Sequence, residues 1–226
     1  RRGGSSLRWS CGTALESLRD RATAEWSTPA HAPPSEAEPL MRVVAGSARG
    51  RRLVAPPGTE VRPTTDRVRE AVFNALGSRD AVVGATVLDL FAGSGALGIE
   101  ALSRGAAHAT FVDSSPRALE AVRTNLDHCG LADRATVVRA DAVEHVRRGG
   151  IDADLVFLDP PYAFDGWQEL LDALPACTAV VESDREVEPP EGWRVLRSRR
   201  YGGSVVLIIE KSDRDEHGQT AAEDRS

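Results

Sequence analysis

The segment Asp159-Pro160-Pro161-Tyr162 places a carboxylate, two prolines and an aromatic ring directly after the apolar run at 155–158. Proline has no N–H, so the two prolines fix the backbone and offer carbonyl oxygens without donors. An ionised aspartate also only accepts hydrogen bonds. Together these groups form an acceptor-only cradle that suits an –NH2 group, and Tyr162 adds a flat face for a nucleic-acid base.

A second segment, residues 86–102, reads TVLDLFAGSGALGIEAL and joins a strand pattern to a helix pattern through a glycine-rich turn. Gly93, Gly95 and Gly98 fit G-x-G-x-x-G, and Asp113 lies 20 residues after Gly93, at the end of the next expected strand. This spacing is typical of sites for adenosine-containing ligands, in which the acid binds ribose hydroxyls. Taken alone, it fits NAD as well as other adenosine ligands.

Asp89 favours a cationic ligand over a dinucleotide, because a carboxylate beside the glycine turn would repel a pyrophosphate. S-adenosylmethionine carries an amino group and a sulfonium and has no phosphate. The pattern D-x-F-x-G-x-G resembles the cofactor motif of class I methyltransferases, and Asp141 would then lie beside the adenine, although it could also be an ordinary helix cap. The resemblance implies these cofactor-binding residues: Asp89, Phe91, Gly93, Gly95, Asp113, Ser114, Asp141 and Ala142.

These motifs require an alternating framework of strands and helices. Such alternation predicts an α/β fold, a seven-stranded, mostly parallel sheet with helices on both faces. The last two strands are joined only by RRYGGS, which predicts an antiparallel pair. Strands are expected at 86–91, 108–113, 135–139, 153–158, 177–182, 193–199 and 203–210, and helices at 96–104, 115–128, 141–148 and 166–174. Ligands bind at the carboxyl ends of parallel strands, so the glycine turn and the DPPY segment would face each other if their strands are neighbours.

The N-terminal part of the chain has a different character. Residues 1–40 contain the stretch STPAHAPPSEAEPL and are expected to be disordered or to precede the true start at Met41, the only methionine. Residues 41–63 are expected to contain a β-hairpin, followed by a helix that Thr64, Thr65 or Asp66 could cap. The main domain is expected at 64–210, and a disordered tail at 211–226.

Basic residues are concentrated although the net charge is −6. Between residues 42 and 69 there are seven arginines against two acids, and a second arginine cluster lies at 194–200. Guanidinium groups bind phosphates and stack on bases, so the hairpin is interpreted as an RNA-binding element. The alternative is a solvated hairpin whose charges prevent aggregation. The candidate RNA-binding residues are Arg42, Arg49, Arg51, Arg52, Arg62, Thr64 and Arg67.

The combined motifs resemble the RsmD family of bacterial 16S rRNA guanine-N2 methyltransferases. They are RVVAG, RGR, RPT, DRVRE, LDLFAGSGALGIEALSRGA, FVD and LDPPY, between Met41 and about Lys211. The Rossmann-like class I methyltransferase fold is thereby implied. The resemblance further implies methyl transfer from S-adenosylmethionine to the exocyclic amine of one guanine, of the guanine-966 type, in the 30S subunit or an assembly intermediate. The residues it implies for catalysis are Asp159, Pro160, Pro161 and Tyr162.

Other readings remain open at this stage: an amino-methyltransferase acting on another base (adenine-N6), an NAD-linked oxidoreductase, or a non-catalytic RNA-binding assembly factor. The three cysteines, Cys11, Cys129 and Cys177, form neither a disulfide framework nor a zinc pattern, so a reducing cytoplasm and no metal are expected. No apolar run has the length of a membrane helix. We expect a monomer that is not associated with a membrane.

Overall fold

The computed structural model describes residues 41–56, 65–175 and 177–211. The predicted extension at 1–40, the predicted tail beyond residue 211, and the candidate residues Arg62 and Thr64 lie outside this part of the chain. The described residues include the glycine turn and the DPPY segment, so the relation between the two motifs can be determined.

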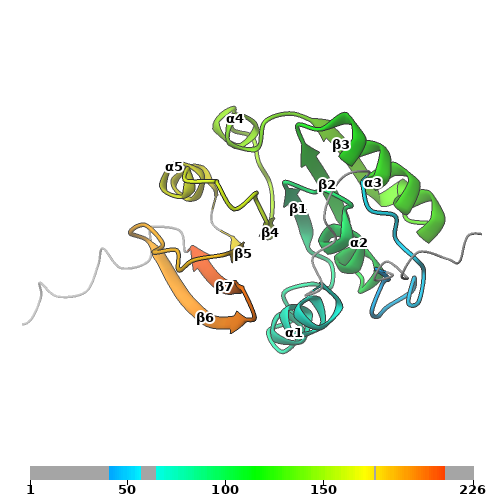
Figure 1. Ribbon diagram of the computed structural model, residues 1–226, viewed down its shortest axis with the longest axis horizontal. Helices are drawn as coiled ribbons and strands as arrows, with labels where there is room; N and C mark the ends of the chain where they lie inside the picture. Colours follow the sequence, from blue (N-terminus) through cyan, green and yellow to red (C-terminus); the bar gives the residue numbers. More distant parts are fainter. Residues whose placement is uncertain (1–40, 57–64, 176, 212–226) are drawn as a thin grey trace, which may run out of the picture. The chain divides into compact units, whose positions relative to one another are not determined.

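The strands of the described residues form one seven-stranded sheet, with strand order β3-β2-β1-β4-β5-β7-β6 (Figure 1). The central pairs are parallel, and β7 is antiparallel to both of its neighbours. This confirms the predicted α/β sheet and places the glycine-turn strand beside the DPPY strand. The strands are β1 (Thr86–Leu90), β2 (His108–Asp113), β3 (Ala135–Arg139), β4 (Leu155–Leu158), β5 (Thr178–Ser183), β6 (Trp193–Tyr201) and β7 (Ser204–Lys211).

Side chains alternate along each strand, so the sheet has apolar side chains on both faces, and helices cover both of them. On one face, Val87 and Phe157 pack into a core shared with α1, α2 and α3. On the other, Leu88 and Leu158 pack into a core shared with α4 and α5. The four residues of β4 are all buried, as expected for a parallel strand covered on both faces. The helices are α1 (Thr65–Gly77), α2 (Ala96–Ser103), α3 (Pro116–Cys129), α4 (Ala142–Arg147) and α5 (Trp167–Ala173), with a 3₁₀ turn, η1 (Ala132–Arg134).

Most element boundaries agree with the prediction to within two residues, and local capping explains why. Pro116 begins α3, and the Ser115 hydroxyl accepts a hydrogen bond from the Ala118 N–H. Gly130 ends α3 with φ of 68°. One boundary was wrong: Lys211 belongs to β7 rather than to the tail, and its ammonium donates to the Leu174 carbonyl (2.7 Å), which follows α5.

The predicted hairpin is present in a reduced form. A single antiparallel bridge joins Arg42 to Arg52, so the two arms are not regular strands. The turn rests on α2: the Ser47 N–H donates to the Ser103 carbonyl (2.8 Å), and a Cβ at Gly46 would lie 1.9 Å from that oxygen. Only glycine fits there, so the turn is held against the helix rather than projecting from an edge of the sheet.

A buried carboxylate fixes the hairpin in place. Glu100 of α2 is fully buried, and its two oxygens accept hydrogen bonds from the N–H groups of Val44 (2.7 Å) and Ala45 (3.0 Å). Arg104 pairs with the same carboxylate at 2.7 Å. A buried charge needs such partners, so this network ties the hairpin to the helix that starts at the glycine turn.

Within the described ranges, no helix has both the length and the apolar character needed to cross a bilayer. The same residues contain no group of three His, Cys, Asp or Glu side chains placed to hold a metal ion.

Candidate active site

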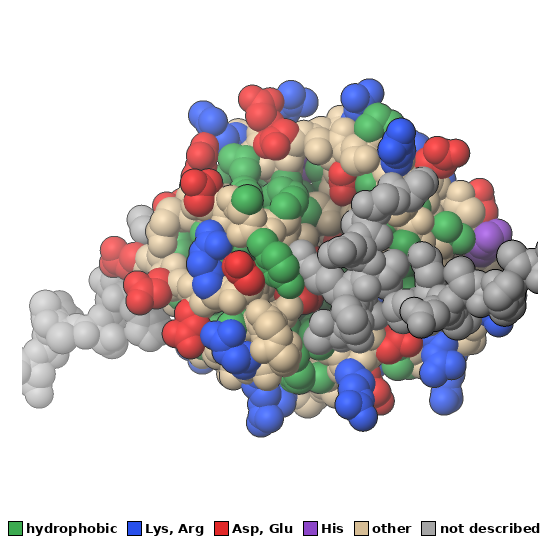
Figure 2. Space-filling model, in the orientation of Figure 1, with side chains coloured by type: hydrophobic (Ala, Val, Ile, Leu, Met, Phe, Trp, Pro, Cys, Tyr) green, Lys and Arg blue, Asp and Glu red, His purple; other side chains and the backbone are tan. Residues whose placement is uncertain are grey.

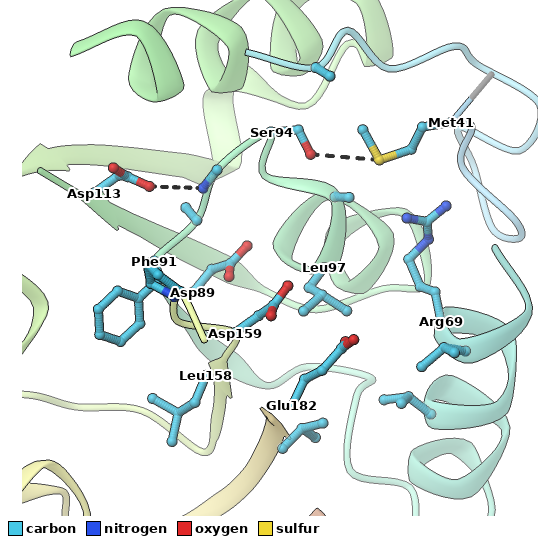
Figure 3. Close-up of a pocket in the computed structure, with 18 of the residues that line it drawn as sticks. Met41, Arg69, Asp89, Phe91, Ser94, Leu97, Asp113, Leu158, Asp159 and Glu182 are labelled. Carbon is cyan, nitrogen blue, oxygen red and sulfur yellow. Dashed lines mark hydrogen bonds between the residues drawn. The ribbon is translucent and has the colours of Figure 1, made fainter. Parts of the chain in front are cut away.

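A cavity of about 440 Å³ opens at the carboxyl ends of β1, β4 and β5 (Figure 3). Its lining includes Gly93 of the glycine turn and Asp159 of the DPPY segment. The two motifs are 66 residues apart in the numbering, and parallel pairing of β1 with β4 brings them together. They therefore form one site at the edge where ligands of open α/β sheets bind.

The glycine turn has the tight geometry that its sequence predicts. Phe91 has φ of 60°, a left-handed conformation that is strained for an aromatic residue, and Gly93 follows with φ of 55°. The Gly93 N–H donates to the Asp113 carboxylate (2.9 Å), which links the turn to the end of β2. A Cβ on Gly98 would lie 2.4 Å from the Phe111 ring, so glycine is needed for close packing of α2 on the sheet.

Asp89 is a buried carboxyl group at the base of this turn. It is 3% exposed, and its Oδ2 accepts a hydrogen bond from the Gly98 N–H (2.9 Å). Burial, together with the nearby charges of Asp159 and Asp113, raises the pKa of Asp89 to about 8. A cation in the cavity would favour the ionised form of Asp89, so the group is suited to a positively charged ligand.

Three carboxylates lie along one wall of the cavity in Figure 3, from Asp89 through Asp159 to Glu182. The sheet register explains the arrangement: Leu158 of β4 pairs with Val181 of β5, so Asp159 and Glu182 come next on neighbouring strands. The concentration of acceptors and negative charge at this wall favours ligands that carry N–H groups or positive charge.

The DPPY segment is held from two sides. Arg185, just after β5, donates from its guanidinium to the carbonyls of Tyr162 (3.1 Å) and Phe164 (2.6 Å). The Phe164 ring packs edge-on against Phe91 at 5.2 Å and against Trp167 at 5.0 Å. The strained residue of the glycine turn is therefore in contact with Phe164, two residues after the DPPY segment.

Comparison with known proteins gives a consistent result. A family model described as "Conserved hypothetical protein 95" matches residues 41–210. "Putative rRNA methyltransferase YlbH" of Bacillus subtilis is 43% identical over 186 residues, covering 76% of this chain and 99% of that protein. "Ribosomal RNA small subunit methyltransferase D" of Escherichia coli is 35% identical over 186 residues, covering 78% of this chain and 92% of that protein. The solved structure "Putative methyltransferase yhhF from Escherichia coli" is 35% identical with a TM-score of 0.68, covering 76% of this chain and 98% of that one.

The chain belongs to the RsmD family. This confirms the resemblance found in the sequence motifs, and the family match begins at Met41, as that resemblance does. The class I methyltransferase fold is confirmed as well.

The RsmD-family cavity brings together some of the predicted residues and leaves others outside its lining. Among the cofactor candidates, Asp141 accepts a hydrogen bond from the Glu144 N–H (3.0 Å) and thereby caps α4. Tyr162 is 45% exposed and lies beside the cavity rather than in its wall. The predicted residues that line the cavity are Asp89, Phe91, Gly93, Asp113, Ser114, Asp159 and Pro161, and those that do not are Gly95, Asp141, Ala142, Pro160 and Tyr162.

The described RNA-binding candidates are all on the surface: Arg42, Arg49, Arg51, Arg52 and Arg67 are exposed. Figure 2 shows basic and acidic side chains interspersed over the described part of the face turned toward the viewer. The structure therefore leaves these arginines accessible to a large anionic partner.

Sequence reasoning did not single out three residues in or beside this cavity. Arg69 is 4% exposed, lines the cavity, and donates to the Arg42 carbonyl (2.6 Å) and to Asp66. Its desolvation lowers the pKa of the guanidinium from the usual value. The other two are Arg185 and Glu182. An acid at the end of an expected strand was a usable signal for Glu182, because strand ends form the site in this fold.

Proposed function

We propose that the protein transfers a methyl group from S-adenosylmethionine to the exocyclic N2 amine of one guanine in small-subunit rRNA. The observation that carries the proposal is the cavity lined by both Gly93 and Asp159, because a cofactor bound at the glycine turn would lie beside an amine bound at the DPPY segment. Two relatives are named as rRNA methyltransferases, which supports RNA as the substrate. We expect the chain to act as a monomer on the 30S subunit or an assembly intermediate.

The residues of the turn fit S-adenosylmethionine, which supplies a methyl group activated by a sulfonium. Asp89 offers a buried carboxylate to its cationic part, and Asp113 offers acceptors to ribose hydroxyls. Gly93 brings backbone close to the ligand without a side chain. The acidic lining argues against a pyrophosphate, and hence against the NAD alternative.

The amine of a base is a weak nucleophile, because its lone pair is delocalised into the ring. The DPPY cradle would make this amine more nucleophilic. Asp159 and a backbone carbonyl of the DPPY segment can accept its two hydrogens, which favours a pyramidal nitrogen with its lone pair directed at the methyl carbon. Positioning contributes much of the rate enhancement in such a transfer. The carboxylate of Asp159 also stabilises the positive charge that develops on the nitrogen. Tyr162, exposed beside the cavity, offers a stacking surface for a base that has left its helix.

The direct test is mass spectrometry of nucleosides from 16S rRNA of cells with and without this protein. We expect N2-methylguanine at one position to disappear when the gene is deleted and to return with a plasmid copy. Loss of a different modified nucleoside, or no loss, would contradict the proposal.

The hairpin arginines provide a prediction about RNA binding. Replacing Arg49, Arg51 and Arg52 with alanine removes three exposed charges, so RNA affinity should fall about tenfold or more at low salt. The slope of log affinity against log salt should become shallower by up to about three, because fewer counterions are released. Filter binding at several salt concentrations measures both effects, and cofactor affinity should not change.

The matched control removes three arginines from β6, the edge strand on the opposite side of the sheet from the 41–56 segment (Figure 1). Arg197, Arg199 and Arg200 are also exposed. If the control variant loses as much RNA affinity as the hairpin variant, binding depends on overall charge and the hairpin has no special role.

Arg185 supplies a second prediction, because it bridges the carbonyl of Tyr162 in the DPPY segment and the carbonyl of Phe164, two residues further on. Arg185→Ala should lower kcat about tenfold through misplacement of the cradle, with little effect on cofactor affinity. Hydrogen exchange at the backbone amides of residues 162–166 should become faster. Arg147→Ala, which removes an exposed arginine paired with Glu169, should change neither quantity. Unchanged hydrogen exchange in the Arg185 variant would show that the hydrogen bonds of Arg185 do not order the DPPY segment and the residues that follow it.

A further inference from the structure

Glu182 places a second carboxylate beside the amine cradle. It follows Val181 in β5 as Asp159 follows Leu158 in β4, and those two preceding residues are paired in the register. Neighbouring strands lie about 4.8 Å apart, so the two acids occupy adjacent positions on the same face. Both line the cavity, and Figure 3 shows their side chains directed into the same space.

The surroundings of Glu182 suit a flat ring. Val180 precedes it on the same face of β5, and Val206 of β7 is its register partner. Both valines line the cavity. A base that enters this end would meet apolar walls along its ring and carboxylates at one edge.

Two adjacent carboxylates can distinguish bases by the hydrogen-bond donors and acceptors at their edges. In guanine the N2 amine is next to N1–H, so two neighbouring positions are donors. In adenine the N6 amine is next to an unprotonated N1, and in cytosine the N4 amine is next to an unprotonated N3, so the neighbouring position is an acceptor. A carboxylate attracts the first arrangement and repels the other two.

We propose that Glu182 accepts the N1–H of the target guanine while Asp159 accepts the neighbouring N2 amine, which makes Glu182 the residue that selects guanine. This rests on the proposed methyl transfer and names what that site recognises. A hydrogen bond to a charged group that is left unmade in a desolvated site typically lowers the rate about 10- to 100-fold. Bases without a donor next to the amine should be rejected by at least that factor.

The test uses two RNA substrates that differ only at the target base, guanine or 2-aminopurine. 2-Aminopurine keeps the amine but has an unprotonated ring nitrogen in place of N1–H. The wild-type protein should methylate the guanine RNA with a kcat/KM at least about 100-fold higher. Glu182→Gln, whose amide can donate, should lose activity on guanine, gain activity on 2-aminopurine, and so reduce the ratio about 100-fold or more.

A merely structural role for Glu182 would lower both activities together. Glu186→Gln removes an exposed acid four residues further along and should keep the wild-type ratio. Calorimetry with S-adenosylmethionine should show that Glu182→Gln still binds cofactor, which verifies the fold independently of activity.

The outcomes separate this inference from the proposed function. If the wild-type protein does not methylate the guanine RNA, the proposed function fails. If it methylates guanine but treats 2-aminopurine equally well, or if Glu182→Gln keeps the wild-type ratio, Glu182 does not read N1–H and the inference is overturned while the function stands.

Discussion

Asp159→Ala is expected to slow methyl transfer by about 10²–10³-fold while leaving a folded protein that still binds S-adenosylmethionine. Asp159 begins the cradle and lies in the wall of the cavity beside Glu182. Without its carboxylate, one amine hydrogen has no acceptor and the charge that develops on the nitrogen is not stabilised. Loss of one such group commonly lowers kcat by about 10²–10³-fold. Single-turnover transfer to unmethylated rRNA measures the chemical step directly.

Two variants make this result specific. Asp159→Asn keeps the shape and one acceptor oxygen, so it should retain more activity than alanine. Asp165→Asn removes an exposed carboxylate a few residues further along and should behave as the wild type. Undiminished transfer by Asp159→Ala would show that the cradle does not act on the amine. Loss of cofactor binding as well would mean that Asp159 belongs to the cofactor site instead.

The parts of this site that could be predicted are the parts encoded locally. The glycine turn, its helix and Asp113 lie within a short stretch whose spacing fixes the geometry, and Pro116 and Gly130 mark the limits of α3. The DPPY segment was predictable for the same reason, because two prolines after an apolar run can only end a strand. The mostly parallel sheet and its antiparallel last pair required only the alternation of patterns and the short RRYGGS connection, whereas the order of the strands was left open.

The parts that could not be predicted depend on contacts between distant residues. Glu100 lies in an apolar helix pattern, and nothing nearby shows that it binds the N–H groups of Val44 and Ala45, more than 50 residues earlier. The position of Glu182 beside Asp159 depends on the pairing of β5 with β4, which are separate segments of the sequence. Strand register is set by the packing of both faces of the sheet, so the sequence of one segment alone does not determine it.

One residue shows how the hairpin and the cofactor turn are connected. Asn125 of α3 is fully buried, accepts a hydrogen bond from the Val54 N–H (2.7 Å), and donates to the Val54 and Ser94 carbonyls (2.9 Å each). The return arm of the hairpin and the glycine turn thus share one side chain.

Asp89→Asn is expected to stabilise the ligand-free protein at neutral pH and to weaken cofactor binding at the same time. The pKa of Asp89 is raised from 3.8 to about 8, so between these values the folded protein holds a proton that the unfolded chain has released. The free energy of unfolding therefore falls as pH rises through this window, by about 1.4 kcal/mol per pH unit, and levels off above pH 8. For a domain of this size the Tm should fall about 3–5 °C per pH unit from this group, and the fall should be absent in the variant.

The same carboxyl group should release a proton when the cofactor binds, because a cation in the cavity favours its ionised form. Calorimetry at pH 7 in two buffers with different ionisation enthalpies measures the number of protons released on cofactor binding. The Asp89→Asn variant should release about one proton fewer than the wild type. The variant keeps an oxygen for the Gly98 N–H (2.9 Å in the wild type) but has no charge for the ligand, so its Kd should rise about 10- to 100-fold. Equal proton release by the two proteins would show that Asp89 does not meet the cationic part of the cofactor. A parallel fall of Tm with pH in both would show that its raised pKa does not govern stability.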